Sequence, residues 1–94
     1  MLIYKAAYFV EDDGVHVEAL DFPGVVSCGR NIDEARGMIQ SALLDMAEYY
    51  LDTGKALPRP DPNATNADAD LEEPLYLLLQ ATSDFDVVPR ELTA

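Results

Sequence analysis

Hydrophobic side chains recur at two different spacings along this chain, and that change limits the folds available to it. Up to Leu20, bulky residues alternate with smaller or polar ones, which is the period of a strand. From residue 32 to residue 53 they recur every three or four residues, the period of an amphipathic helix. Because 94 residues make one domain, both kinds of element must share one core. We therefore expect an α+β fold.

The first two strands are predicted over residues 2–10 and 15–20 and should form a hairpin. Between them, Asp13-Gly14 supplies the positive φ that tight hairpin turns need. Alternate residues of a strand lie on the same side of the sheet. One side of the first strand contains Leu2, Tyr4, Ala6, Tyr8 and Val10, and one side of the second contains Val15, Val17 and Ala19.

The segment after the hairpin turns the chain sharply. Pro23 donates no backbone hydrogen bond and so interrupts a strand ladder, and Gly24 permits the corner that follows. Residues 25–28 are long enough for a short third strand, which Gly29 ends. The segment therefore has an architectural explanation.

A long helix is predicted over residues 32–53. Asn31 is a good N-cap, and Glu34 three residues later completes a capping-box pattern. Gly54 is a candidate C-cap. The apolar stripe expected to be buried against the sheet contains Ala35, Met38, Ile39, Ala42, Leu43, Met46, Tyr49 and Tyr50.

The last third of the chain has weaker patterns. Prolines make residues 57–62 extended, and residues 63–74 are predicted to be a loop. The apolar run at 75–81 is interpreted as a buried strand that returns to the sheet, with a short helix as the alternative. Residues 82–94 form a tail, with one more extended piece at Val87-Val88-Pro89 as a possibility.

No catalytic, metal or cofactor site is predicted. Cys28 precedes a helix start, but a nucleophile also needs a base, and the only histidine is His16 on the hairpin. We interpret Cys28 as a half-buried strand residue and His16 as an exposed one. The acidic pairs have no calcium-loop spacing and are interpreted as solvated turn residues; they are Asp12-Asp13, Asp68 with Asp70, and Asp84 with Asp86.

The net charge of −12 argues against direct binding of nucleic acid, because phosphates repel such a surface. One acidic group has a regular position. Asp45, Glu48 and Asp52 fall on the side of the predicted helix that faces away from the apolar stripe. This face is either simply solvated or a docking surface for a basic protein partner.

The sequence favours a cytoplasmic protein. A single cysteine cannot form an internal disulfide, and neither a signal peptide nor a membrane-spanning run is recognisable.

The order of these elements resembles the HicB-like antitoxin family. The resemblance covers roughly residues 4–62 and depends on the corner Asp21-Phe22-Pro23-Gly24, on Gly29, and on the helix start Asn31-Ile32-Asp33-Glu34-Ala35. Phe22 stands where the family has leucine, and Asn31 keeps the capping role of its threonine. Residues 1–94 would then be a single HicB-like domain.

The resemblance implies a small, mostly antiparallel sheet in β-β-β-α-β order, partly RNase H-like, with one long helix on one face. Family members typically bind and inhibit HicA, a small basic RNA-cleaving toxin, and assemble as homo-oligomers, so a dimer or tetramer is expected here. Many also carry a C-terminal DNA-binding segment, for which residues 82–94 are too short.

Three functions stay open at this point. The chain is an antitoxin-type inhibitor, or a solitary oligomeric regulatory or ligand-binding domain of the same fold without a toxin partner. An enzyme ranks last, because no coherent set of catalytic residues is present.

Overall fold

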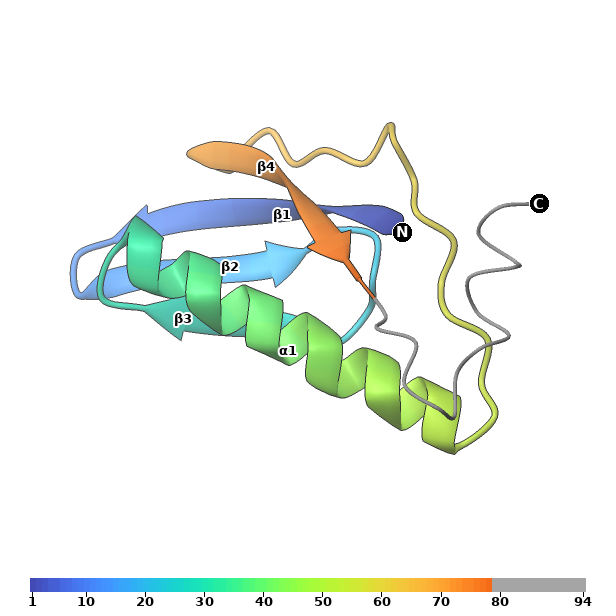
Figure 1. Cartoon of the computed structure of the whole chain (residues 1–94). Coiled ribbons are helices and arrows are strands. Elements are labelled where there is room, and N and C mark those ends of the chain that lie inside the picture. The colour runs from blue at the N-terminus through green and yellow to red at the C-terminus, as the bar shows by residue number, and fades with distance from the viewer. Residues whose placement is uncertain (79–94) are drawn as a thin grey trace.

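The computed structural model describes residues 1–78. It confirms the predicted α+β fold in β-β-β-α-β order (Figure 1). The predictions for residues 79–81, for the tail at 82–94 and for Asp84 and Asp86 lie outside the described residues. The elements are β1 (Leu2–Glu11), β2 (Gly14–Ala19), β3 (Val26–Gly29), α1 (Ile32–Asp52) and β4 (Leu71–Leu77).

The four strands form one antiparallel sheet in the order β3-β2-β1-β4. Strands β1 and β2 form the predicted hairpin, in which Ala6 pairs with Ala19 at one end and Glu11 with Gly14 at the other. Helix α1 lies across one face of this sheet (Figure 1). The first strand is therefore central, and its second neighbour comes from the last described element.

The core lies between α1 and the sheet. From the helix, a single row of residues spaced four apart is fully buried: Ala35, Ile39, Leu43 and Ala47. Two residues of the predicted stripe, Met38 and Tyr49, are instead exposed. The predicted stripe was too wide: Ala42, Met46 and Tyr50 beside the buried row are partly buried and pack against the core, but the core does not reach Met38 and Tyr49.

Strand β4 begins earlier than predicted and includes a proline. It starts at Leu71, so the loop prediction is wrong for residues 71–74, the last third of the predicted 63–74 loop. Pro74 is tolerated because it faces Lys5, whose N–H and C=O both bond on the other side, to Asp21 and Leu20. The N–H that Pro74 lacks would therefore point to the open edge of the sheet, where prolines are accepted.

Both ends of α1 are capped by local hydrogen bonds. The Asn31 side chain accepts a bond from the backbone N–H of Glu34 at 2.8 Å. At the other end Gly54 has φ +75°, and the N–H groups of Gly54 and Lys55 donate to the carbonyls of Leu51 and Tyr50. This is the Schellman arrangement, which needs a left-handed residue and therefore favours glycine.

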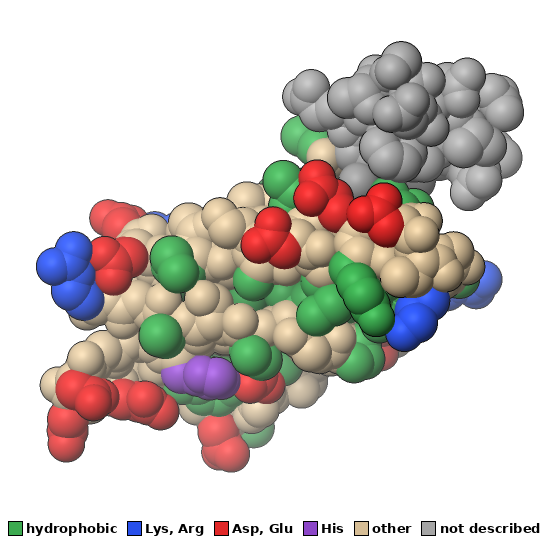
Figure 2. Space-filling model, turned by 90° about the horizontal axis from the view of Figure 1, so that it is seen from below, with side chains coloured by type: hydrophobic (Ala, Val, Ile, Leu, Met, Phe, Trp, Pro, Cys, Tyr) green, Lys and Arg blue, Asp and Glu red, His purple; other side chains and the backbone are tan. Residues whose placement is uncertain are grey.

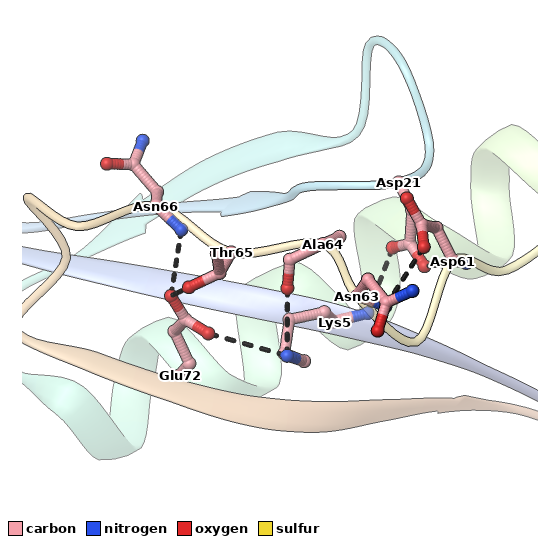
Figure 3. Close-up of polar contacts among 8 residues, drawn as sticks. All are labelled: Lys5, Asp21, Asp61, Asn63, Ala64, Thr65, Asn66 and Glu72. Carbon is pink, nitrogen blue, oxygen red and sulfur yellow. Dashed lines mark hydrogen bonds and ion pairs between the residues drawn. The ribbon is translucent and has the colours of Figure 1, made fainter.

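The proline-rich segment after α1 is held against β1. The Tyr4 hydroxyl donates to the carbonyl oxygen of Pro58 at 2.6 Å. The Asp21 carboxylate accepts from the backbone N–H groups of Lys5 at 3.0 Å and Asp61 at 2.8 Å. The Lys5 ammonium donates to the carbonyl oxygen of Ala64 at 2.9 Å (Figure 3). Residues 55–70 thus form an ordered connection between α1 and β4.

We expect Asp21→Ala to lower the free energy of unfolding by about 2 kcal/mol, because two backbone donors lose a charged acceptor. Asp21→Asn retains one acceptor oxygen, so its free energy of unfolding should lie between that of Asp21→Ala and that of the wild type. Urea denaturation of the three proteins measures this order. An unchanged midpoint for Asp21→Ala would show that this carboxylate does not hold the segment.

Candidate partner-binding surface

Asp45, Glu48 and Asp52 form the acidic strip, and all three are exposed on α1. They lie on the side of the helix away from its buried row because the two sets differ by about half a helical turn. Figure 2 shows one face of the molecule, on which acidic side chains gather in several groups with hydrophobic ones between them. The strip is thus open to a partner.

The acidic strip forms no ion pair with another residue among residues 1–78. Five ion pairs are present there, and none includes a member of the strip; they are Lys5–Glu72, His16–Glu18, Arg30–Glu34, Arg36–Asp33 and Arg36–Glu73. The last turn of α1 also contains no basic residue. The negative end of the helix dipole and the strip therefore add to each other.

The N-terminal half of α1 differs, because its acids are paired. Arg30 binds Glu34 at 2.9 Å, and its hydrogen bonds hold the pKa of that carboxyl below its usual range. Arg36 Nη2 lies 2.6 Å from Glu73 Oε2 and likewise lowers the pKa of Glu73. These contacts attach the start of the helix to its cap and to β4. Glu34 and Glu73 therefore have a structural role, which the carboxylates of the acidic strip lack.

A shallow hollow lies beside the strip and is lined by Gly24, Ala42, Asp45, Met46 and Tyr49. We call it the Asp45 hollow. Tyr49 keeps 52% of its surface exposed. The Lys55 ammonium lies 5.4 Å from the centroid of the Tyr49 ring. The hollow could not be predicted from the sequence, because the helical spacing placed Tyr49 in the buried stripe and only the folded corner brings Gly24 against the helix.

The remaining candidates lie elsewhere and do not form a site together with the strip. Cys28 is exposed rather than half-buried, because it sits on the edge strand β3. It faces His16 on β2, but the imidazole Nε2 is engaged by Glu18 Oε2 at 2.9 Å. Asp70 accepts from the backbone N–H of Val10 at 2.7 Å and has a structural role. The other acidic residues predicted to be solvated, Asp12, Asp13 and Asp68, are exposed.

Two kinds of feature are absent from residues 1–78. No group of three or more His, Cys, Asp or Glu side chains is placed to hold a metal ion within that range. No helix in the same range has the length and apolar character to cross a membrane.

Comparison with known proteins assigns the fold. No family model and no curated protein matches the sequence. Among solved structures, the N-terminal domain of the Burkholderia pseudomallei antitoxin HicB aligns with a TM-score of 0.67 and 20% identity, over 83% of this chain and 100% of that one. The chain has the fold of a HicB N-terminal domain. The predicted resemblance to HicB is thereby confirmed at the level of structure.

Two further solved structures share this HicB-type fold. A chain of the HicA3 and HicB3 toxin–antitoxin complex aligns with a TM-score of 0.56 and 22% identity, over 65% of this chain and 73% of that one. A chain of a toxin–antitoxin complex from Streptococcus pneumoniae aligns with a TM-score of 0.64 and 16% identity, over 97% of this chain and 88% of that one.

Proposed function

We propose that this protein is a HicB-like antitoxin that binds and inhibits a small basic RNA-cleaving toxin of the HicA type. The observation that carries the proposal is the acidic strip on α1, whose three carboxylates form no ion pair in the described part of the chain. A basic protein would supply the missing charges and would be steered to this face. The protein acts by binding and is not an enzyme.

Similar structures support the choice of partner. Two of the aligned chains come from structures described as toxin–antitoxin complexes, one of them of HicA3 with HicB3. The Burkholderia pseudomallei chain is described as an antitoxin domain. We transfer this role to the present chain as part of the proposal, together with a cytoplasmic location.

We also propose that the protein forms a homo-oligomer, a dimer or a tetramer. The two edges of the sheet differ in a way that bears on this. Strand β4 is protected by Pro74 and by the acidic residues Glu72 and Glu73, whereas β3 contains neither a charge nor a proline. Unprotected edge strands tend to pair with other chains.

One observation favours a second function, that of a solitary regulatory or ligand-binding domain. An apolar groove of about 510 Å³ lies at the N-terminal end of β1, next to the proline-rich segment. Its volume is within the range of small-molecule sites. Its lining includes Met1, Leu2, Ile3, Pro60, Pro62 and Pro74.

Calorimetric titration with the product of the neighbouring gene tests the proposal. We expect a submicromolar Kd that rises with salt, since charged pairs at an interface rim are screened. Neutralising the acidic strip with Asp45→Asn, Glu48→Gln and Asp52→Asn should raise the Kd about tenfold, because each exposed pair contributes up to about 1 kcal/mol.

The matched control neutralises three exposed acids at the hairpin turn, Glu11→Gln, Asp12→Asn and Asp13→Asn. It changes the net charge by the same amount at a different place, so the Kd should rise less than threefold. If both triple variants lose the same affinity for the partner, net charge alone explains the effect and the acidic strip has no special role. Absence of binding would contradict the antitoxin proposal and favour a solitary regulatory or ligand-binding domain without a toxin partner.

A further inference from the structure

We propose that the Asp45 hollow receives an arginine side chain of the basic protein partner. This inference rests on the proposed function and adds the kind of residue that the partner inserts. The hollow combines an apolar floor with one carboxylate and one exposed aromatic ring. Each of these parts matches a different part of an arginine side chain.

The floor of the hollow fits the aliphatic stem of such a side chain. Ala42 and Met46 are partly buried residues that pack against the core. Gly24 adjoins them, and a Cβ at this position would come 3.4 Å from the Met46 methyl group and so narrow the hollow. Long cationic side chains bury their methylene groups along apolar surface of this kind while their charge stays in water.

The walls of the hollow fit the guanidinium group. Asp45 is the one acid of the strip that lines the hollow, and it has no ion-pair partner within residues 1–78. The Tyr49 ring lies in the same lining. A planar guanidinium can bond a carboxylate with two N–H groups and stack on an aromatic face, which an ammonium cannot do.

Contacts within the chain show that this aromatic surface accepts a cation. The Lys55 ammonium lies 5.4 Å from the centroid of the Tyr49 ring and 5.5 Å from that of Tyr50. Tyr50 in turn packs against Phe22 at the corner. Cation–π contacts form within about 6 Å of a ring centroid. The ring that borders the hollow is therefore already in a cationic contact.

The position of the hollow on α1 adds a longer-range attraction. It lies in the C-terminal half of a helix whose last turn contains no basic residue. Glu48 and Asp52 add two negative charges nearby without lining the hollow. A partner cation is thus attracted by the strip as a whole and held by Asp45. The three acids therefore have different roles: Asp45 binds the cation directly, and Glu48 and Asp52 attract it from nearby.

The test uses the full-length protein and N-acetyl-arginine amide as the probe, followed by ¹H–¹⁵N NMR. We expect saturable shifts centred on Gly24, Ala42, Asp45, Met46 and Tyr49. The neutral isostere N-acetyl-citrulline amide should cause no such shifts, and N-acetyl-lysine amide should bind more weakly. Asp45→Asn and Tyr49→Ala should each weaken the arginine probe about two- to fivefold. Glu48→Gln is the matched control and should change its affinity less than twofold.

Other results would overturn the inference. Chemical shift changes spread evenly over all acidic regions would show that the probe only screens charge and has no site. Equal losses of probe affinity in Asp45→Asn and Glu48→Gln would show that the hollow has no special role. Shifts of the same residues on dilution of the protein alone would assign the hollow to a second copy. Tighter probe binding in Lys55→Gln would assign the ring to this chain's own lysine, which already contacts Tyr49.

The probe experiment does not involve the toxin, so the two proposals fail separately. If the probe binds and the neighbouring protein does not, the hollow recognises arginine but the proposed function is wrong. If the neighbouring protein binds and Asp45→Asn weakens it no more than Glu48→Gln, the function holds and the inference is wrong.

Discussion

Gly29→Ala is expected to destabilise the protein by about 3 kcal/mol, the upper end of the usual cost of overpacking. A Cβ at this position would lie 2.5 Å from the backbone nitrogen of Ala35 and 2.9 Å from its Cα. Both are main-chain atoms in the first turn of α1, so they cannot rotate out of the way. Either the end of β3 or the start of the helix must shift.

Gly37→Ala is the matched control for this substitution. It adds the same methyl group to a glycine with no atom within 4 Å of the new Cβ, on the exposed side of α1. It should stabilise the protein by about 0.5–1 kcal/mol, because alanine favours the helix more than glycine does. Urea denaturation measures both variants. Equal midpoints for Gly29→Ala and the wild type would mean that the helix start adjusts at no cost.

Phe22→Ala is expected to lower the free energy of unfolding by about 3–5 kcal/mol, the range for removing a fully buried phenylalanine. Its ring is fully buried, 5.1 Å from that of Tyr4 and 5.2 Å from that of Tyr50. Phe22 therefore connects the corner to β1 and to the C-terminal half of α1. Thermal and urea unfolding both report the loss.

Phe22→Leu separates volume from aromatic contact. It keeps most of the apolar volume and should cost less than about 1.5 kcal/mol. A loss in Phe22→Leu as large as that in Phe22→Ala would show that ring contacts rather than cavity formation determine the effect. A Phe22→Ala protein as stable as the wild type would mean that the corner contributes nothing to the core.

The elements determined by local chemistry could be predicted from the sequence. The Asp13-Gly14 pair indicated the hairpin, although the turn itself consists of Asp12 and Asp13. Asn31 with Glu34 marks the start of α1 within a residue of its observed position. In each case the residues that decide the structure are neighbours in the sequence. Their hydrogen bonds are therefore visible before the fold is known.

The parts that depend on strand order could not be predicted. Pro74 appeared to precede the strand and not to lie within it, since only an edge strand accepts a proline, and the sequence does not show which strand is at the edge. The Asp45 hollow forms between the corner and the helix, so neither segment alone reveals it. Periodicity also placed Tyr49 on the buried side, because it cannot tell how wide a face the sheet covers.

The central position of β1 has a consequence for synthesis of the chain. One neighbour of β1 follows it directly, but the other, β4, begins at Leu71, about 60 residues after Glu11. At about 5–20 residues per second, the ribosome needs roughly 3–12 s to deliver it. During that interval β1 has an unpaired edge in the nascent chain, as it would in any product truncated before Leu71. Such edges pair readily with other chains, so incomplete copies of this protein are the species most prone to aggregate.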